Sequence, residues 1–258
     1  MRLYFHYFMI QLKSTMQYKV SFFLTLGSQL IISLSAFFEV YFLFTRFKSV
    51  AGFTFEEVLL CYSAIMASYS IVECFMRGFD VFTAIISNAK FDRIMVRPQN
   101  EILQVLGEQA DFSRLSRILQ AVVVMCYAIP MSGILWTWQK VLLYTLMIVC
   151  GTLLFAGLFV IYASLSFFTT EGIEFMNIFI NGGREFGAYP FAVYGKNVLR
   201  IVTYFIPLAL VQYYPCLYLT GRTDSLFHFI LPLLALLFLI PCMLLWKLGM
   251  RHYRSVGS

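Results

Sequence analysis

Long runs of apolar residues alternate with shorter polar segments along the chain. Six such runs can be drawn, at about residues 20–44, 58–76, 118–136, 141–168, 201–219 and 226–246. Each is long enough to cross a hydrocarbon core of about 30 Å as a helix, and a helix satisfies its own backbone hydrogen bonds in lipid. The runs lack the strict alternation of a membrane β-barrel. The pattern predicts an all-α, multi-pass membrane protein with six spans, and residues 1–258 form a single transmembrane domain.

Residues 1–19 precede the first run and carry an amphipathic pattern. Apolar side chains recur at helical spacing there, at Leu3, Tyr4, Tyr7, Phe8 and Leu12. This spacing, with lysines further along, is typical of a helix that lies in the membrane interface. A simple cytoplasmic start to the first span is the alternative.

Lysine and arginine are unevenly distributed between the two sides that six spans define. Both termini then lie on one side, together with the segments 77–117 and 169–200. That side holds 15 of the 19 basic residues: Arg2, Lys13, Lys19, Arg77, Lys90, Arg93, Arg97, Arg114, Arg117, Arg184, Lys196, Arg200, Lys247, Arg251 and Arg254. Because basic residues concentrate in cytoplasmic loops, both termini are predicted to be cytoplasmic.

The composition agrees with lipid as the solvent. Hydrophobic residues make up 60% of the chain and charged residues only 12%, whereas a soluble domain carries about 25% charged residues. In such a protein the net charge of +6 reflects loop orientation and anionic headgroups rather than nucleic acid.

No catalytic or metal-binding pattern accompanies the apolar runs. The six cysteines have no CxxC spacing and fit small buried hydrophobic positions, and the three histidines are far apart. Gly195-Lys196 does not complete a phosphate-binding loop, because Pro190 and Asn197 occupy the places of the required glycine and Ser or Thr. The glycines of "GGREFG", 182–187, fit turns better than a nucleotide site. The chain itself is expected to bind no cofactor and to catalyse no reaction.

Two acidic residues stand inside the predicted spans, where charge is costly and often functional. Glu73 lies near the inner end of the second run, and Arg77 follows four residues later on the same helix face. The spacing favours an ion pair; a cavity carboxylate that attracts cationic substrates is the alternative. Glu39, toward the outer end of the first run, is either an interface residue or a second such pathway carboxylate.

The fifth run contains Pro207 and Pro215, which interrupt helical hydrogen bonding. Tyr213 and Tyr214 lie between them, at interfacial depth. These prolines predict either simple kinks or a re-entrant external gate, with the two tyrosines as pathway candidates.

A compact basic segment, "SNAKFDRIMVRPQN" (87–100), lies within the first long polar region. It is either an anchor that keeps the loop in the cytoplasm or an ordered element that contacts a soluble partner.

Three stretches together resemble the membrane subunits of type-two ABC exporters, in particular the bacterial group of small permeases. They are the basic aromatic start "MRLYFHYFMIQLKSTMQYKVSFF", the loop "ISNAKFDRIMVRPQN" and the late block "FGAYPFAVYGKNVLRIVTYFIPLALVQYYPCLYLTGR". The last block is the most specific of the three. The resemblance covers essentially the whole chain and implies six spans with cytoplasmic termini in the bacterial cell membrane.

The resemblance also implies partners and a coupling helix. Such a permease pairs with a second permease, identical or different, and with separate ATPase subunits that bind ATP and Mg²⁺. The loop between spans two and three would dock on the ATPase, through Lys90, Phe91, Asp92, Arg93 and Arg97, with Pro98 ending the helix. Separately from the resemblance, the aromatic content of 18% would suit a cavity for an amphipathic drug, peptide or lipid, with helix packing and lipid contact as the alternative use of these side chains. A secondary transporter or channel that works without ATP is the alternative, and an intramembrane enzyme has no candidate nucleophile, base or metal set.

Overall fold

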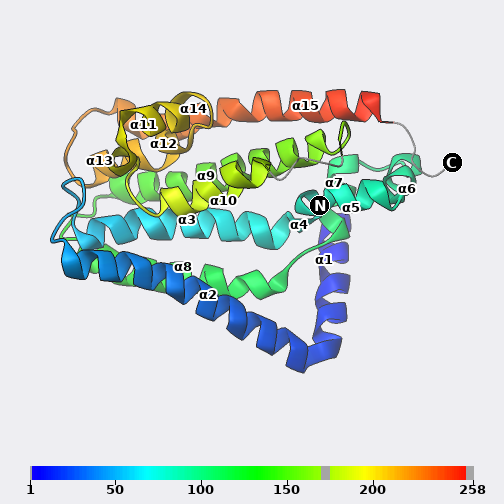
Figure 1. Cartoon of the computed structure of the whole chain (residues 1–258), viewed down its shortest axis with the longest axis horizontal. Helices are drawn as coiled ribbons and strands as arrows, with labels where there is room; N and C mark the ends of the chain where they lie inside the picture. The colour runs from blue at the N-terminus through cyan, green and yellow to red at the C-terminus, as the bar shows by residue number, and fades with distance from the viewer. Residues whose placement is uncertain (1, 170–174, 254–258) are drawn as a thin grey trace.

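The protein is a bundle of long helices with several short helices gathered at its two ends (Figure 1). The computed structural model describes residues 2–169 and 175–253. In this described part, regular structure is helical except for one isolated bridge between Val50 and Phe53. The described chain begins and ends at the same end of the bundle (Figure 1), as an even number of crossings requires. The predicted all-α class is confirmed.

Five stretches are long and apolar enough to cross a membrane. They are His6–Arg46, Phe55–Phe75, Phe112–Met131, Trp138–Leu165 and Phe227–His252. The helices that form most of them are α2 (Lys19–Arg46), α3 (Phe55–Phe75), α8 (Leu115–Met131), α9 (Trp138–Leu165), and α14 (Phe227–Ala235) joined through the 3₁₀ turn Leu236–Phe238 to α15 (Leu239–His252). A sixth stretch, Phe191–Tyr204 with Leu208–Leu219, is bent by 90°.

Helix α3 occupies the centre of the bundle, since almost all of its side chains are buried. Its start is fixed by a capping box. The Thr54 hydroxyl accepts a hydrogen bond from the Glu57 backbone, and the Glu57 carboxylate accepts one from the Thr54 backbone. The helix therefore begins at Phe55, three residues before the apolar run.

Helix α8 ends earlier than the apolar run predicts, at Met131 instead of Trp136. Pro130 lies in its last turn, and Gly133 follows with a positive φ of 65°. These two residues end the helix. Ile134, Leu135 and Trp136 are apolar, so hydropathy alone extends the predicted span beyond this end, because it does not take backbone conformation into account.

The N-terminal helix α1 (Arg2–Thr15) lies across one end of the bundle, at an angle to α2 (Figure 1). Tyr4 donates a hydrogen bond to the Phe75 carbonyl oxygen, and the Phe8 ring packs on Phe75 and Phe112. The amphipathic pattern is thus used for packing against the end of α3 and the segment before α8, in the place expected for an interfacial helix.

Four short helices connect α3 to α8 at this same end (Figure 1): α4 (Arg77–Asp80), α5 (Phe82–Ser87), α6 (Lys90–Val96) and α7 (Glu101–Glu108). A 3₁₀ turn at Phe112–Arg114 leads into α8. We call this region the α4–α7 end. The opposite end carries the connection between α2 and α3.

The segment 169–200, predicted to be a loop at the α4–α7 end, instead contains a helix inside the bundle. This helix, α10 (Phe175–Gly187), packs along α3 and α9. Gly183 contacts Phe155 and Leu208, and Gly187 contacts Ile65, which lies midway along α3. These glycines bring the helices close together and do not form turns. Residues 170–174 of the predicted loop lie outside the described residues.

Helix α10, with 13 residues, is not among the helices long enough to cross a membrane, and the apolar run 201–219 belongs to a stretch bent by 90° and is not a continuous span. Helices α11 (Gly195–Tyr204), α12 (Leu208–Val211) and α13 (Tyr213–Leu219) fold together at the end that carries the α2–α3 connection (Figure 1). The bend agrees with the re-entrant alternative. It also moves Lys196 and Arg200 to the opposite end from α4–α7, which weakens the predicted charge asymmetry without reversing it.

Candidate functional site

Helix α6 presents an exposed surface at the α4–α7 end. Its exposed side chains, with those of the two residues that follow, form what we call the α6 tip: Arg93, Met95, Val96, Arg97 and Pro98. The helix ends at Val96 because Arg97 is extended, as expected for a residue that precedes proline. The side chains of Met95 and Val96 are 49% and 84% exposed. The tip thus combines two guanidinium groups with apolar side chains.

Phe91 does not belong to this surface, contrary to the prediction that it contacts a soluble partner. Its ring is fully buried. Ring centroids of Phe82, Phe167 and Tyr253 lie 5.2, 5.2 and 5.0 Å from it. Trp246 of α15 closes this aromatic cluster. Phe91 therefore fixes α6 to the ends of α9 and α15.

Polar contacts with neighbouring elements also hold α6 in place. The Tyr253 hydroxyl donates a hydrogen bond of 2.9 Å to Asp92 Oδ1. Burial, together with this carboxylate, raises the pKa of Tyr253 to about 12, so the hydroxyl keeps the proton that it donates. Lys90 lies 3.9 Å from Glu108 of α7. Of the predicted coupling residues, Arg93, Arg97 and Pro98 are exposed and have no such contact with another residue that the structure describes.

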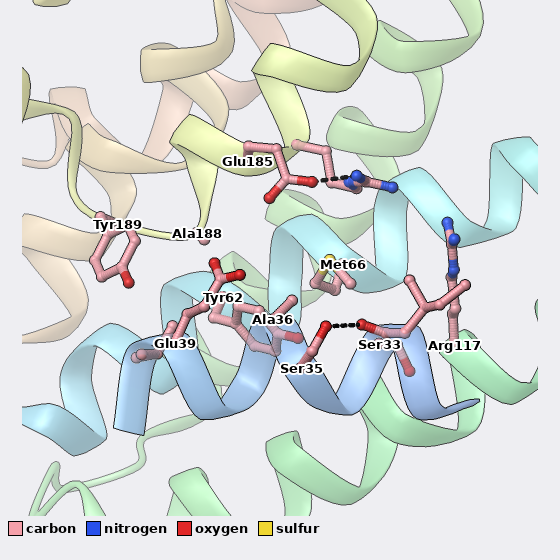
Figure 2. A pocket seen from close by; sticks show the side chains of 13 residues that line it. Ser33, Ser35, Ala36, Glu39, Tyr62, Met66, Arg117, Glu185, Ala188 and Tyr189 are labelled. Carbon is pink, nitrogen blue, oxygen red and sulfur yellow. Dashed lines mark hydrogen bonds and ion pairs between the residues drawn. The ribbon is translucent and has the colours of Figure 1, made fainter. Parts of the chain in front are cut away.

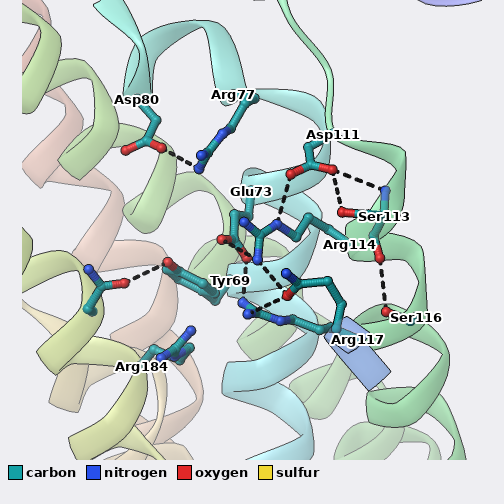
Figure 3. Close-up of polar contacts among 12 residues, drawn as sticks. Tyr69, Glu73, Arg77, Asp80, Asp111, Ser113, Arg114, Ser116, Arg117 and Arg184 are labelled. Atoms are coloured by element: carbon teal, nitrogen blue, oxygen red, sulfur yellow. Dashed lines mark hydrogen bonds and ion pairs between the residues drawn. The ribbon is translucent and has the colours of Figure 1, made fainter. Parts of the chain in front are cut away.

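A buried charge network lies where α2, α3 and α8 meet (Figure 3). Glu73 Oε2 accepts a hydrogen bond of 2.8 Å from Arg117, and Glu73 Oε1 lies 3.2 Å from Arg114 Nη1. The predicted pair of Glu73 with Arg77 is wrong: Arg77 pairs with Asp80, three residues further on. Tertiary partners from α8 have displaced the local one.

Two further side chains complete this network. Gln29 of α2 accepts hydrogen bonds of 2.8 Å from both Arg114 and Arg117. Asp111 Oδ2 accepts one of 3.0 Å from Arg114. Burial raises the pKa of Asp111, but its hydrogen bonds with Ser113 and the Arg114 guanidinium outweigh burial and leave the pKa below its usual value. Two guanidinium groups thus meet two carboxylates, and the buried charges cancel.

Glu39, in contrast to Glu73, lines a cavity of about 120 Å³ between α2, α3, α8 and α10 (Figure 2). Arg117 and Arg184 line the same cavity, as do Glu185, Tyr62 and Tyr189. Arg184 pairs with Glu185 and lies over the Tyr69 ring, 5.1 Å from its centroid. Glu73 is not among the residues that line the cavities found in the described part of the chain.

Tyr213 and Tyr214 lie in the re-entrant element and are half-buried. Their ring centroids are 5.3 Å apart, and Tyr213 also approaches Phe53 in the α2–α3 connection. The bend of the element lies at Pro207, which directly precedes α12. Pro215 lies in the first turn of α13, where its missing N–H breaks no helical hydrogen bond, so the kink predicted at Pro215 is wrong.

The outer end of α13 is fastened to α3. Arg222 pairs with Glu57 and lies over the Phe53 ring, 3.6 Å from its centroid. One turn deeper, the Cys61 and Cys216 sulfur atoms are 2.7 Å apart. Both cysteines are buried and free. The re-entrant element is therefore held at a defined position on α3.

Comparison with family models identifies the family of the chain. A model described as "ABC-2 family transporter protein" matches residues 30–257. The chain belongs to the ABC-2 family. Comparisons with curated proteins and with solved structures found no match.

Membership of the ABC-2 family makes this chain a membrane component of a transport system, as the resemblance predicted. The family assignment does not depend on the individual site residues. Several site residues were not predicted from the sequence. Met95 and Val96 lie between the basic residues Arg93 and Arg97, and Arg114 and Arg117 stand three residues apart at the start of an apolar run. That spacing places both guanidinium groups on one helix face, a signal of a shared buried partner.

Proposed function

We propose that the protein is the permease subunit of an ATP-binding cassette exporter, driven by separate ATPase subunits that dock on the α6 tip. The observation that carries the proposal is the contrast between the two faces of α6. One face is fixed by the buried Phe91 ring, and the other exposes Arg93, Met95, Val96 and Arg97. A mixed basic and apolar surface on a rigid support suits a protein interface.

The aromatic cluster around Phe91 gives docking a mechanical consequence. ATP binding would close the ATPase pair and displace α6. Since Phe91 packs against Phe167 and Trp246, that displacement reaches the ends of α9 and α15 directly. Movement of these helices would close the cavity on one side and open it on the other. The ATPase can shift this equilibrium only as far as it binds the two states with different free energies.

The remaining parts of the assembly are also proposals. A second permease, identical or different, would form the pathway with this chain in the bacterial cell membrane, with α4–α7 on the cytoplasmic side. The apolar side chains exposed along α2, among them Phe23, Ile31 and Phe42, would then face lipid or that permease. An amphipathic drug, peptide or lipid is the proposed substrate class. Our alternative is a secondary transporter or channel without an ATPase.

Reversal of two charges tests the docking surface. The variant Arg93→Glu with Arg97→Glu should insert and fold normally but lose ATP-driven export in proteoliposomes, because the new carboxylates would repel a partner surface that complements the two guanidinium groups. Lys247→Glu with Arg251→Glu is the matched control. These residues are also exposed, four apart, near the same end of the bundle.

The control separates docking from membrane anchoring. If α6 is only a positive anchor, both double variants should reduce insertion alike and leave export per inserted molecule unchanged. That result would remove the docking role. Purification in mild detergent addresses the alternative function: a secondary transporter would copurify with no ATPase, and its transport would follow an ion gradient.

A further inference from the structure

The cavity beside Glu39 combines charge and aromatic rings. We propose that it binds the ammonium head of an amphiphilic cation, and that such cations are the exported substrates. The second half of this inference rests on the proposed export function, whereas binding itself does not. Figure 2 shows Glu39, Glu185, Tyr62 and Tyr189 around one side of the cavity, with Arg117 on the other.

The charge balance selects a cation. The cavity and the network behind it hold three guanidinium groups, of Arg114, Arg117 and Arg184. They also hold four carboxylates, of Glu39, Glu73, Asp111 and Glu185. Every guanidinium has a carboxylate partner. Glu39 alone of these carboxylates has no ion pair with any described residue, so the site carries one uncompensated negative charge that a monovalent cation would neutralise.

The position of Glu39 makes an uncompensated charge costly. Glu39 lies seven residues before the end of α2 at Arg46, which is roughly 10 Å along the helix axis. Its side chain is exposed toward the cavity side of the bundle instead of reaching an internal partner. A carboxylate at this depth in a span normally faces a partner or a water-filled pathway. A bound cation supplies that partner.

The tyrosines favour an organic cation over a metal ion. Tyr62 is 1% exposed, and its hydroxyl group lies beside the Gln120 side chain, so the ring is the part of Tyr62 that is offered to a ligand. Tyr189 contributes a half-buried ring. Aromatic faces attract ammonium groups, and quaternary ammonium ions are recognised in aromatic-lined sites. Metal ions would require several converging oxygen ligands, and the described residues contain no group of three or more suitable side chains.

The cavity volume limits what enters. About 120 Å³ admits a trimethylammonium group but not a whole drug-sized molecule, which needs about 300 Å³ or more. The apolar part of the ligand would therefore remain outside the cavity, along the exposed apolar side of α2. This arrangement requires an amphiphile whose charge is confined to a compact head.

Equilibrium dialysis of radiolabelled phenyltrimethylammonium tests the site directly. The complete complex in nanodiscs should bind this cation and should not bind benzenesulfonate, an anion of similar size. Glu39→Gln should weaken cation binding by about tenfold or more, because it removes the uncompensated charge. Glu39→Asp, which keeps the charge, should retain most of the affinity. Glu56→Gln is the control, since Glu56 is also without an ion pair among described residues but does not line the cavity.

Three results would overturn the site: no cation binding by the folded complex, equal binding by wild type and Glu39→Gln, or equal binding of benzenesulfonate. Each is a binding result and leaves the ATPase-dependent export test intact. Conversely, cation binding without ATP-driven export would support the site while removing the export function.

The same ammonium chemistry occurs in choline lipids and in free solutes. Nanodiscs of choline lipid and of glycerol lipid distinguish these sources. Weaker phenyltrimethylammonium binding in choline lipid would assign the site to lipid headgroups, and equal binding would assign it to solute cations. Both results support recognition of a quaternary ammonium head.

Discussion

Replacement of Glu73 by glutamine should destabilise the fold through the charges that it leaves behind. The Glu73 side chain is 6% exposed and pairs with two guanidinium groups at 2.8 and 3.2 Å. Removal of one partner from a buried ion pair typically costs about 3–5 kcal/mol. Arg114 would keep Asp111, but Arg117 would keep only Gln29. Since one guanidinium alone loses its carboxylate, we expect about 3 kcal/mol, at the lower end of that range.

A double-mutant cycle with Arg117→Met tests this explanation. If the cost of Glu73→Gln is mainly the unpaired Arg117 guanidinium, the double variant should be less destabilised than the sum of the single variants, by about 2 kcal/mol. The free energy of unfolding can be measured by titration with a denaturing detergent in mixed micelles. Glu56→Gln, a carboxylate in the first turn of α3 without an ion pair, should change it by less than about 1 kcal/mol.

Two results would refute the reasoning: a cost of Glu73→Gln that matches the Glu56→Gln control, or a double variant whose cost equals the sum of the single ones. Either would mean that the buried network contributes no coupling energy. Export per folded molecule offers a separate check, because a structural carboxylate should leave it unchanged, whereas a pathway carboxylate should not.

Two further predictions concern other parts of the structure. The pKa of Asp111 is lowered from its usual value in the folded protein, so its ionised form contributes stability that is complete near neutral pH and is lost as the pH falls through the folded pKa. Asp111→Asn should lower stability at pH 7 and flatten the stability profile below about pH 5, measured by the same titration. Cys61 and Cys216 should form an intramolecular disulfide when treated with diamide, which takes up the two electrons and two protons; mass spectrometry should show the linked peptides, and their absence would contradict the placement of α13 on α3.

The sequence predicts the long crossings well because lipid leaves few alternatives for an apolar run. Helices α2, α3, α9 and α14–α15 fall where hydropathy places them, with ends shifted by caps and prolines. The packed helix α10 is missed by hydropathy for a physical reason. Helix α10 carries polar side chains that other helices satisfy: Asn181 accepts a hydrogen bond from the Tyr69 hydroxyl, and Arg184 lies over the same ring. The hydropathy of one segment does not show that other helices supply partners for its polar side chains.

One part of the candidate site could likewise be predicted from the sequence and another part could not. Phe91 and Ile94 are both buried and stand three residues apart, so helical periodicity could have separated them from the exposed Arg93 and Arg97. Helical periodicity could not predict the pairing of Glu73 with Arg117. A local partner, Arg77, was available at suitable spacing, and only the packing of α8 against α3 brings Arg117 closer.

These observations single out α2 as the least buried of the long helices that could cross a membrane. Only Phe22, Ser33 and Val40 of its side chains are buried. Its polar ties include Gln29 to the two arginines and the Ser33 carbonyl oxygen to Gln120. The Glu73 pairs belong to α3, α8 and the turn before α8, so they would persist if α2 moved. Since Glu39 moves with α2 while Tyr62 and Arg117 stay behind, a displacement of α2 would open or close the proposed cation cavity without breaking the Glu73 ion pairs.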